Sequence, residues 1–359
     1  MLPAHGGNIK EVIDKYKIRE DRIIDFSNNI NPLGISPGIK NILNRNLNSL
    51  TQYPDPQCRS ARKALSGYWG IDKDNLLLGN GSNELIHLVP RSLACSRVLT
   101  YQPAFSEYEF SVKASGAKPY FLFSGKKEGF RIDLDKIISY LPKVDLIILC
   151  NPNNPTGHLL KKEGLLKLAK ACEDNKVYLL IDEVFMDFVD KEKESSLLKE
   201  SVKKDYLLIL RSFTKFFSLP GLRVGYLVGG KKTIKRIASF QVSWSVNSLA
   251  QEIVAKGLKD RKFIEKTKRY LLKEKDFLFN NLKRINGLMP YYPSANFIFC
   301  KICSGKLDSG KLFLRLLKSG ILIRDCSNFR GLDNKFFRVA VKRRGDNLYL
   351  IKHLRKAFQ

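Results

Sequence analysis

The sequence predicts an α/β protein with two parts: a large part whose mixed, mostly parallel sheet lies between helices, and a smaller C-terminal α+β part. Between about residues 75 and 230, continuous apolar runs such as LIILC (146–150) alternate with amphipathic stretches such as LLKLAKACEDNK (165–176). This alternation is typical of parallel strands that helices cover on both faces. Beyond about residue 232 it gives way to a long helical pattern and a few separate strands.

The elements follow in order from their end signals. The first 30 residues form an arm with a short helix, and SPGIKNILNRNLNSL (36–50) predicts a helix with Pro37 in its first turn. SARKALSGYWG (60–70) predicts a helix that ends at Gly70. Apolar runs then predict the strands of the large sheet, in 75–79, 97–102, 117–123, 144–150, 177–182, 206–213 and 224–228.

The C-terminal part begins with one helical stretch over roughly 250–286. Three strands follow, ANFIFCKI (295–302) and the expected pair ILIRDC (321–326) and FFRVAV (336–341). With 359 residues and 44% hydrophobic content, the chain can bury a core in each part. We expect an arm and part of the small domain at 1–45, a large domain at 46–248 and a small C-terminal domain at 249–359.

Composition limits the classes of function. The net charge of +28 first suggests a nucleic-acid partner. The basic residues are spread along amphipathic helices, however, without a zinc finger, an RNP sequence or a basic tail, so we expect no nucleic acid and infer instead an attraction for anionic substrates. Cys300 and Cys303 form a CxxC without a second pair or a nearby histidine, which we interpret as strand thiols and not as a metal site.

Cellular location is inferred from what the chain lacks. No run reaches the roughly 18 apolar residues of a membrane span. The opening residues have no apolar stretch behind a basic tip, as a signal peptide would have. Seven scattered cysteines, an odd number, suit a reducing compartment. We therefore expect a soluble, cytoplasmic protein with no membrane partner.

Candidate functional residues lie in loops that follow predicted strands, where α/β sheets bind ligands. GNGSNE (79–84) opens a helix, so Ser82, Asn83 and nearby backbone N–H groups can bind an anion at the helix N-terminus. A tight turn with a helix cap is the alternative explanation. NPNNPTG (151–157) is a rigid loop that fixes the amide of Asn154 above the sheet.

A third loop starts at Asp182, which ends a buried apolar strand. A carboxylate in such a place needs a partner or a chemical task. The fourth loop is RSFTKFFSLPGLRVGY (211–226), in which the amine of Lys215 can condense with an aldehyde. The hydroxyls of Ser212 and Thr214 can donate to phosphate oxygens, and Arg223 can bind a phosphate through two parallel hydrogen bonds.

Together the four loops supply what pyridoxal 5'-phosphate (PLP) requires. They offer an amine for its aldehyde, hydroxyls and a guanidinium for its phosphate, an amide for its phenolate oxygen and a carboxylate for its ring nitrogen. A carboxylate that keeps this nitrogen protonated lets the ring draw in the electrons of a carbanion at the substrate's α-carbon.

In this order, NPNNPTG, DE and S-x-T-K followed by PGLRVGY, the motifs resemble the aminotransferase class I/II superfamily, whose members are fold-type I PLP-dependent enzymes. The resemblance covers essentially the whole chain. It implies a Schiff base at Lys215, Asp182 on the pyridine nitrogen and Asn154 on the phenolate oxygen. It also implies a stacking ring at Phe105 and phosphate contacts from Ser82, Asn83, Ser212, Thr214, Arg223 and, from the other subunit of an obligate homodimer with shared sites, Tyr53.

The superfamily contains several reactions, and two subfamilies fit best. These are the threonine-phosphate decarboxylases, which make the aminopropanol phosphate linker of cobalamin, and the histidinol-phosphate aminotransferases. Local features that resemble the decarboxylases more closely are AHGGNIKEV (4–12), IIDFSNNINPLG (23–34), Phe185, WSVNSLAQ (244–251), ILIRDCSNFRGLD (321–333) and FFRVAVK (336–342).

By the same resemblance the substrate, a phosphorylated amino acid, lies against His5, Gly6, Asn29, Asn154, Arg324 and Arg338. Ordinary loop and surface roles are the alternatives for His5 and Arg324. The sequence leaves open threonine phosphate against serine phosphate. It also leaves two other functions: transamination of histidinol phosphate, and a basic scaffold or nucleic-acid-binding protein that keeps a relic of the cofactor fold.

Overall fold

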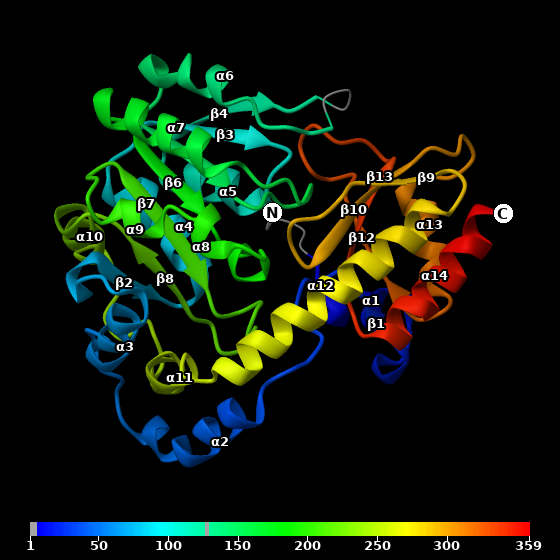
Figure 1. Ribbon diagram of the computed structural model, residues 1–359, viewed down its shortest axis with the longest axis horizontal. Helices are drawn as coiled ribbons and strands as arrows, with labels where there is room; N and C mark the ends of the chain where they lie inside the picture. Colours follow the sequence, from blue (N-terminus) through cyan, green and yellow to red (C-terminus); the bar gives the residue numbers. More distant parts are fainter. Residues whose placement is uncertain (1–5, 126–128) are drawn as a thin grey trace.

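The computed structural model describes residues 6–125 and 129–359 (Figure 1). Its largest element is a seven-stranded sheet, here called the central sheet, with strand order β2-β8-β7-β6-β5-β3-β4. Neighbouring strands are parallel except β8, which is antiparallel to both β2 and β7. This confirms the predicted mixed, mostly parallel sheet. The strands are β2 (Leu76–Gly79), β3 (Arg97–Gln102), β4 (Lys118–Phe123), β5 (Leu146–Cys150), β6 (Tyr178–Asp182), β7 (Leu207–Ser212) and β8 (Gly225–Val228).

Helices cover both faces of the central sheet, and this explains the continuous apolar runs. In β6, Leu179 and Ile181 belong to the core on one face, while Leu180 belongs to the core on the other. Alternate residues of a strand point to opposite faces, so a strand buried on both sides needs apolar residues throughout.

The first core is completed by α3 (Arg59–Trp69), α7 (Lys162–Asp174) and α11 (Ser248–Gly257). The second core is completed by α4 (Gly81–Ser92), α5 (Ser106–Ala114) and α10 (Lys231–Ala238). Short helices connect the strands: α6 (Leu134–Ile138), α8 (Glu192–Ser195) and α9 (Leu198–Ser201).

A second sheet, here called the C-terminal sheet, has the antiparallel order β12-β13-β10-β9. Its core is shared with three helices. The strands are β9 (Leu288–Pro290), β10 (Phe297–Ile302), β12 (Arg324–Asp325) and β13 (Phe336–Ala340), and the helices are α12 (Arg261–Lys283), α13 (Ser309–Leu317) and α14 (Arg344–Phe358).

The N-terminal arm joins this part of the molecule. It contains α1 (Ile9–Tyr16), β1 (Ile24–Asp25) and α2 (Pro37–Arg45). Strand β1 pairs in parallel with β11 (Ile321–Leu322), so the arm runs along the C-terminal half of the chain before it crosses to the central sheet.

Two predicted elements were wrong in their extent. The single helix over 250–286 is two helices, because Asp260 starts a new one by accepting a hydrogen bond from Phe263 N at 3.2 Å. The stretch ILIRDC is not one strand paired with FFRVAV: β12 pairs with β13, but β11 pairs with β1. The arm's hydrogen bonds divide the stretch, and no local pattern in 321–326 reveals that.

In Figure 1, β3 and β4 point toward the C-terminal sheet. The carboxyl ends of the parallel strands therefore lie at the edge of the central sheet that faces the second sheet, where α/β folds bind ligands. Within the described ranges, no helix has both the length and the apolar character to cross a bilayer.

Candidate active site

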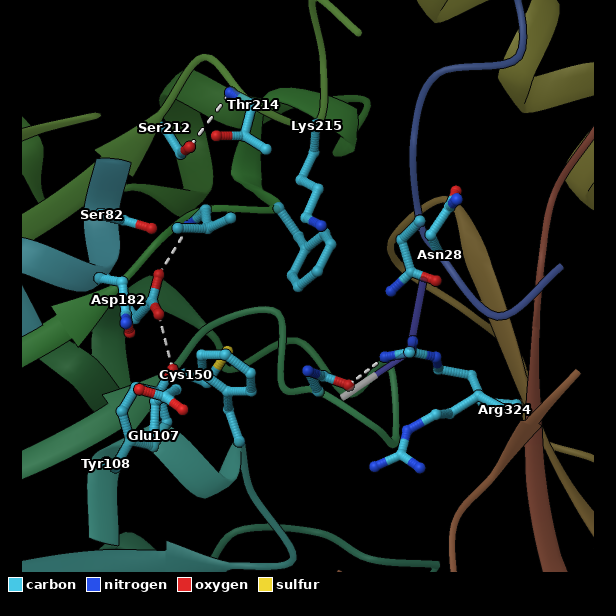
Figure 2. A pocket seen from close by; sticks show the side chains of 18 of the residues that line it. Asn28, Ser82, Glu107, Tyr108, Cys150, Asp182, Ser212, Thr214, Lys215 and Arg324 are labelled. Atoms are coloured by element: carbon cyan, nitrogen blue, oxygen red, sulfur yellow. Dashed lines mark hydrogen bonds between the residues drawn. The ribbon is translucent and has the colours of Figure 1, made fainter. Parts of the chain in front are cut away.

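A cavity of about 290 Å³ lies where the central sheet, the N-terminal arm and the C-terminal sheet meet (Figure 2). Its lining includes all the predicted site residues except two. Tyr53 is not part of the lining, and His5 lies outside the described residues. Residues that are up to about 300 positions apart in the chain thus share one cavity.

The amine of Lys215 extends into this cavity from the loop after β7 (Figure 2). Burial, together with the positive charges of Arg338 and Arg223, lowers the pKa of Lys215 from 10.5 to about 8. The arm fixes the loop, because Asn31 N donates to the carbonyl oxygen of Lys215 at 3.0 Å. A lysine with such a pKa has an appreciable neutral fraction near physiological pH and can act as a nucleophile.

Asp182 ends β6 at the floor of the cavity. Burial raises its pKa from 3.8 to about 6, although two hydrogen bonds oppose the rise. The Tyr108 hydroxyl donates to Oδ2 at 2.6 Å, and Val184 N donates to Oδ1 at 3.0 Å. These donors fix the orientation of the carboxylate, so that it can hold one proton on a bound heterocycle.

An anion-binding cup forms where α4 begins. Gly81 has a φ of +76°, and a Cβ atom at this position would overlap the Arg223 guanidinium. Arg223 therefore lies against the helix N-terminus because residue 81 has no side chain. Ser212 Oγ accepts from Thr214 N at 3.1 Å, which folds the loop so that Ser212, Thr214 and Ser82 all line the cup. A guanidinium, hydroxyls and a helix N-terminus together suit a phosphate group.

Arg338 lies on the opposite wall and is fully buried, which lowers its pKa to about 10. Its Nη1 donates to Asn154 Oδ1, and its Nη2 donates to the Ser27 carbonyl oxygen at 2.9 Å. Its Nε has no hydrogen-bond partner among the described residues. A buried donor left in this way points to a ligand that would accept from it.

Arg324 also reaches the cavity from this wall (Figure 2). Its Nη1 donates to the Asp325 carbonyl oxygen at 2.7 Å, and its Nη2 donates to Asn328 Oδ1 at 2.9 Å. Gly6 and Asn29 of the arm complete the wall. The cavity thus has one cationic end at Arg223 and a second at Arg324 and Arg338, with Lys215 between them.

Two predicted residues need separate comment. Phe105 lines the cavity immediately before α5, with its ring 5.7 Å from that of Tyr108 in an edge-to-face arrangement. Tyr53 is 82% exposed and packs against Trp244, with ring centroids 4.9 Å apart. Within this chain, therefore, the Tyr53 side chain points to the surface and not into the cavity.

Several lining residues were missed by the sequence reasoning, namely Ser27, Asn28, Glu107, Tyr108, Cys150 and Phe329. Tyr108 had a local signal, because it follows Phe105 by three residues at the start of a helix and so lies on the same face. Glu107 is buried, and its Oε2 lies 3.3 Å from His87 Nε2. The others sit in loops that only the folded chain brings to the cavity.

A charged network also escaped notice, directly below the cup. Arg211 is fully buried and pairs with Glu183, Asp187 and Glu192 at 2.8, 2.9 and 2.8 Å. These carboxylates raise the pKa of Arg211 although burial opposes the rise. Because Arg211 immediately precedes Ser212, the network anchors the strand end that carries the cup. Breaking such a buried pair leaves an uncompensated charge and is strongly destabilising.

The fit of PLP to this cavity can be judged from the residues themselves. The phosphate cup exists because position 81 lacks a Cβ, and Asn83 Oδ1 is buried with no partner among the described residues. Lys215 and Asp182 both line the same cavity as the cup. An amine, a carboxylate and an anion cup around one space are the groups that a phosphorylated pyridine aldehyde needs.

Comparison with known proteins agrees with this chemistry. The family model described as aminotransferase class I and II matches residues 21–354. A protein of Caldanaerobacter subterraneus subsp. tengcongensis named "Putative threonine-phosphate decarboxylase" is 40% identical, over 99% of this chain and 94% of its own length. The threonine-phosphate decarboxylase of Salmonella typhimurium is 34% identical, over 98% of this chain and 96% of its own.

Among solved structures, the histidinol-phosphate aminotransferase of Clostridium acetobutylicum has a TM-score of 0.88 and is 34% identical, covering 94% of this chain and 99% of its own. The relatives therefore include both decarboxylases and aminotransferases. What they share with this chain is a full-length match to one family. The chain belongs to the aminotransferase class I and II family and is a PLP-dependent enzyme.

Proposed function

We propose that the protein decarboxylates L-threonine O-3-phosphate, releasing carbon dioxide and forming (R)-1-amino-2-propanol O-2-phosphate for cobalamin biosynthesis. The observation that carries the proposal is the second cationic end of the cavity, formed by Arg324 and Arg338 across Lys215 from the cofactor cup. A substrate with both a carboxylate and a phosphate matches two guanidiniums in one place.

The cofactor-binding residues are proposed on the same basis. Lys215 supplies the amine for the cofactor aldehyde, Asp182 holds the proton on the ring nitrogen and Asn154 faces the phenolate oxygen. Phe105 covers one face of the ring. The phosphate contacts come from Ser82, Asn83, Ser212, Thr214 and Arg223. The bound cofactor supplies an electron sink for the pair that remains on the α-carbon.

The substrate-binding residues decide which bond breaks. A bond perpendicular to the cofactor ring is weakened, because its electrons overlap the π system as it breaks. We assign the substrate phosphate to Arg324, Asn29, Gly6 and His5. With the phosphate held there, the carboxylate takes the perpendicular position near Arg338. The carboxylate leaves as carbon dioxide, and the ammonium of Lys215 donates a proton to the α-carbon.

The principal alternative is transamination of histidinol phosphate, which the similarity to the Clostridium acetobutylicum enzyme supports. Phe185 supports decarboxylation instead. Its ring lies 5.1 Å from that of Phe297, edge to face, and lines the cavity near Asp182. Histidinol-phosphate aminotransferases usually have a tyrosine here, so this chain lacks a hydroxyl that could bond to the cofactor.

We further propose a cytoplasmic homodimer in which Tyr53 completes the partner's cofactor cup. Its 82% exposure and its absence from the cavity of its own chain support this role. All seven cysteines are free, as expected in a reducing compartment. The proposed division of the chain is an arm with part of the small domain at 1–45, a large domain at 46–248 and a small domain at 249–359.

A turnover assay of the purified protein tests the proposal. With L-threonine O-3-phosphate we expect release of carbon dioxide and formation of aminopropanol phosphate. L-serine O-phosphate is assayed side by side, because one methyl group contributes only about 1–3 kcal/mol of discrimination in an apolar pocket. Nitrogen transfer from glutamate to imidazole-acetol phosphate, without carbon dioxide release, would reject decarboxylation. A colourless protein with steeply salt-dependent DNA binding would favour a scaffold instead.

A further inference from the structure

The loop that carries Arg324 also contacts the central sheet. This loop, here called the strap (residues 324–332), leaves β12 and returns to the C-terminal sheet at β13. In Figure 1 the loop before β13 lies beside the ends of β3 and β4. The strap thus belongs to the C-terminal sheet by hydrogen bonding and to the central sheet by contact.

Inside the strap, Arg324 is coupled to Phe329. The Arg324 guanidinium lies over the Phe329 ring, 5.0 Å from its centroid, and both side chains line the cavity. Phe329 N donates to the Cys326 carbonyl oxygen at 3.0 Å, which keeps the turn between them short. The position of residue 329 therefore influences where the Arg324 guanidinium lies.

On its outer side, the next residue binds the large part of the molecule. Arg330 Nε and Nη2 donate to Glu109 Oε2 and Oε1 at 3.0 and 2.8 Å, which is a bidentate pair. The same guanidinium lies over the Phe121 ring of β4, 4.3 Å from its centroid. A Cβ atom at Gly331 would lie 2.8 Å from Phe123, so the strap backbone approaches β4 closely.

Glu109 is well placed for this role. It lies on α5, next to Tyr108, which holds Asp182 at the floor of the cavity. Lys113 also binds Glu109 Oε1, at 2.7 Å, one helical turn away. One short helix thus fixes both the carboxylate at the cofactor end and the strap at the substrate end.

We propose that Arg330 is a positioning residue, which sets the location of Arg324 for the substrate phosphate by docking the strap onto Glu109. Arg330 is 45% exposed and does not line the cavity, so it acts through Phe329 and Arg324 and not by contact with the substrate. The proposal rests on the proposed function only in that Arg324 binds a phosphate.

Arg97 provides a matched control. It is 46% exposed and pairs with Asp145 at 2.8 Å, but it lies at the amino end of β3, away from the cavity. Exposed pairs of this kind contribute little to global stability. Arg330→Gln and Arg97→Gln should therefore lower the melting temperature by similar, small amounts, and any further effect of Arg330→Gln reports on the strap.

Hydrogen exchange of the cofactor-loaded enzyme without substrate gives the first measurement. We expect the strap amides, such as Leu332 N, which donates to the Phe329 carbonyl oxygen at 3.0 Å, to exchange on the order of tenfold faster in Arg330→Gln. Arg97→Gln should leave them unchanged. Equal exchange in Arg330→Gln and the wild type overturns the proposal.

Phosphate binding gives the second measurement. In Arg330→Gln we expect KM for the phosphorylated amino acid to rise about tenfold while kcat stays within about twofold. The dissociation constant of inorganic phosphate, measured by calorimetry on the cofactor-loaded enzyme, should rise similarly. The charge-reversed double variant Arg330→Glu with Glu109→Arg should restore much of the affinity.

The phosphate titration needs no turnover, so it separates this proposal from the assigned reaction. If the enzyme fails to decarboxylate but Arg330→Gln still weakens phosphate binding, the positioning role stands and the proposed function fails. If phosphate binds Arg330→Gln and Arg97→Gln equally well, the positioning role is rejected even where the strap exchanges faster.

Discussion

At the scale of single residues, the two central groups of the site owe their chemistry to burial. Burial lowers the pKa of Lys215 and raises that of Asp182, and in each case it favours the uncharged form. Neither shift can be read from the sequence, because the groups responsible lie far away in the chain. The candidate residues themselves could be predicted, since each follows an apolar strand at a distinctive loop.

Lys215 should capture the cofactor in a pH-dependent way. With a pKa of about 8, its neutral fraction rises with pH and levels off above about 8.5, and at pH 7 about a tenth of it is neutral. The rate at which cofactor-free protein binds PLP, followed by absorbance, should show this midpoint. Arg338→Met should shift the midpoint upward, because it removes a positive neighbour.

Arg344→Met is the control for this shift, because Arg344 pairs with Glu274 away from the cavity. It should leave the midpoint unchanged. Lys215→Ala should lose the yellow absorbance altogether, and borohydride should fix the cofactor to the peptide that contains Lys215. A yellow Lys215→Ala protein would show that another amine holds the cofactor.

Asp182 should make the cofactor-free protein less stable as pH rises. Its pKa is about 6 in the folded protein and 3.8 in the unfolded chain, so between these values the folded state binds more protons. The stability penalty is absent below about pH 4 and complete above about pH 6. Asp182→Asn should therefore raise the free energy of unfolding at pH 7 by about 1–3 kcal/mol.

Denaturant titrations at pH 4 and pH 7 measure this difference. The gain should vanish at pH 4, where the native Asp182 is protonated too. Asp174→Asn, an exposed partner of Lys170, should change stability by less than about 0.5 kcal/mol at either pH. A destabilised Asp182→Asn protein at pH 7 would mean that the Tyr108 hydrogen bond outweighs burial.

At the scale of elements, the start of α4 decides whether a phosphate cup exists. Gly81 and Gly34 share a φ of +76°, but nothing lies within 4 Å of a Cβ at Gly34, while one at Gly81 overlaps Arg223. Both alanine variants should therefore lose about 1–2 kcal/mol of stability from the left-handed backbone. Only Gly81→Ala should also displace Arg223.

The expected consequence is specific to the cofactor. In Gly81→Ala the affinity for PLP should fall by about ten- to a hundredfold, the contribution of hydrogen bonds to a charged group. Gly34→Ala should bind PLP as the wild type does. Titration of both cofactor-free variants with PLP measures this, and equal affinities would show that Arg223 does not bind the phosphate.

The elements also show where local patterns stop being informative. The strands of the central sheet could be predicted because each is buried on both faces and so carries an unbroken apolar run. The strands β11 and β12 could not be separated within ILIRDC, because their division depends on the arm strand β1 about 300 residues earlier. Helix α12 begins at a single capping residue, Asp260, inside a continuous apolar pattern.

At the scale of the whole molecule, exposed apolar side chains gather in two segments that meet through Tyr53 and Trp244. The exposed residues in these segments are Leu47, Leu50, Tyr53, Phe240, Val242 and Trp244. A set of this kind is typical of a subunit interface. It agrees with the proposed dimer, in which Tyr53 reaches the partner's site.

Sedimentation equilibrium tests this interface. Val242→Glu places a charge in the middle of the apolar set, at a residue that is 76% exposed in one chain, and should yield monomers with weakened PLP binding. Leu348→Glu is the control, because Leu348 is 51% exposed on α14 and should leave the dimer intact. A Val242→Glu variant that stays dimeric would place the interface elsewhere.

The sequence by itself determined the fold class, the cofactor and the residues of the cofactor half of the site. It could do so because those residues stand next to strand ends and glycines, where local chemistry and position in the sheet coincide. The tertiary structure decided the rest: the shifted pKa values of Lys215 and Asp182, the role of Tyr108, the buried network around Arg211 and the strap. Each of these depends on desolvation or on contacts between distant segments, and such contacts exist only in the folded chain.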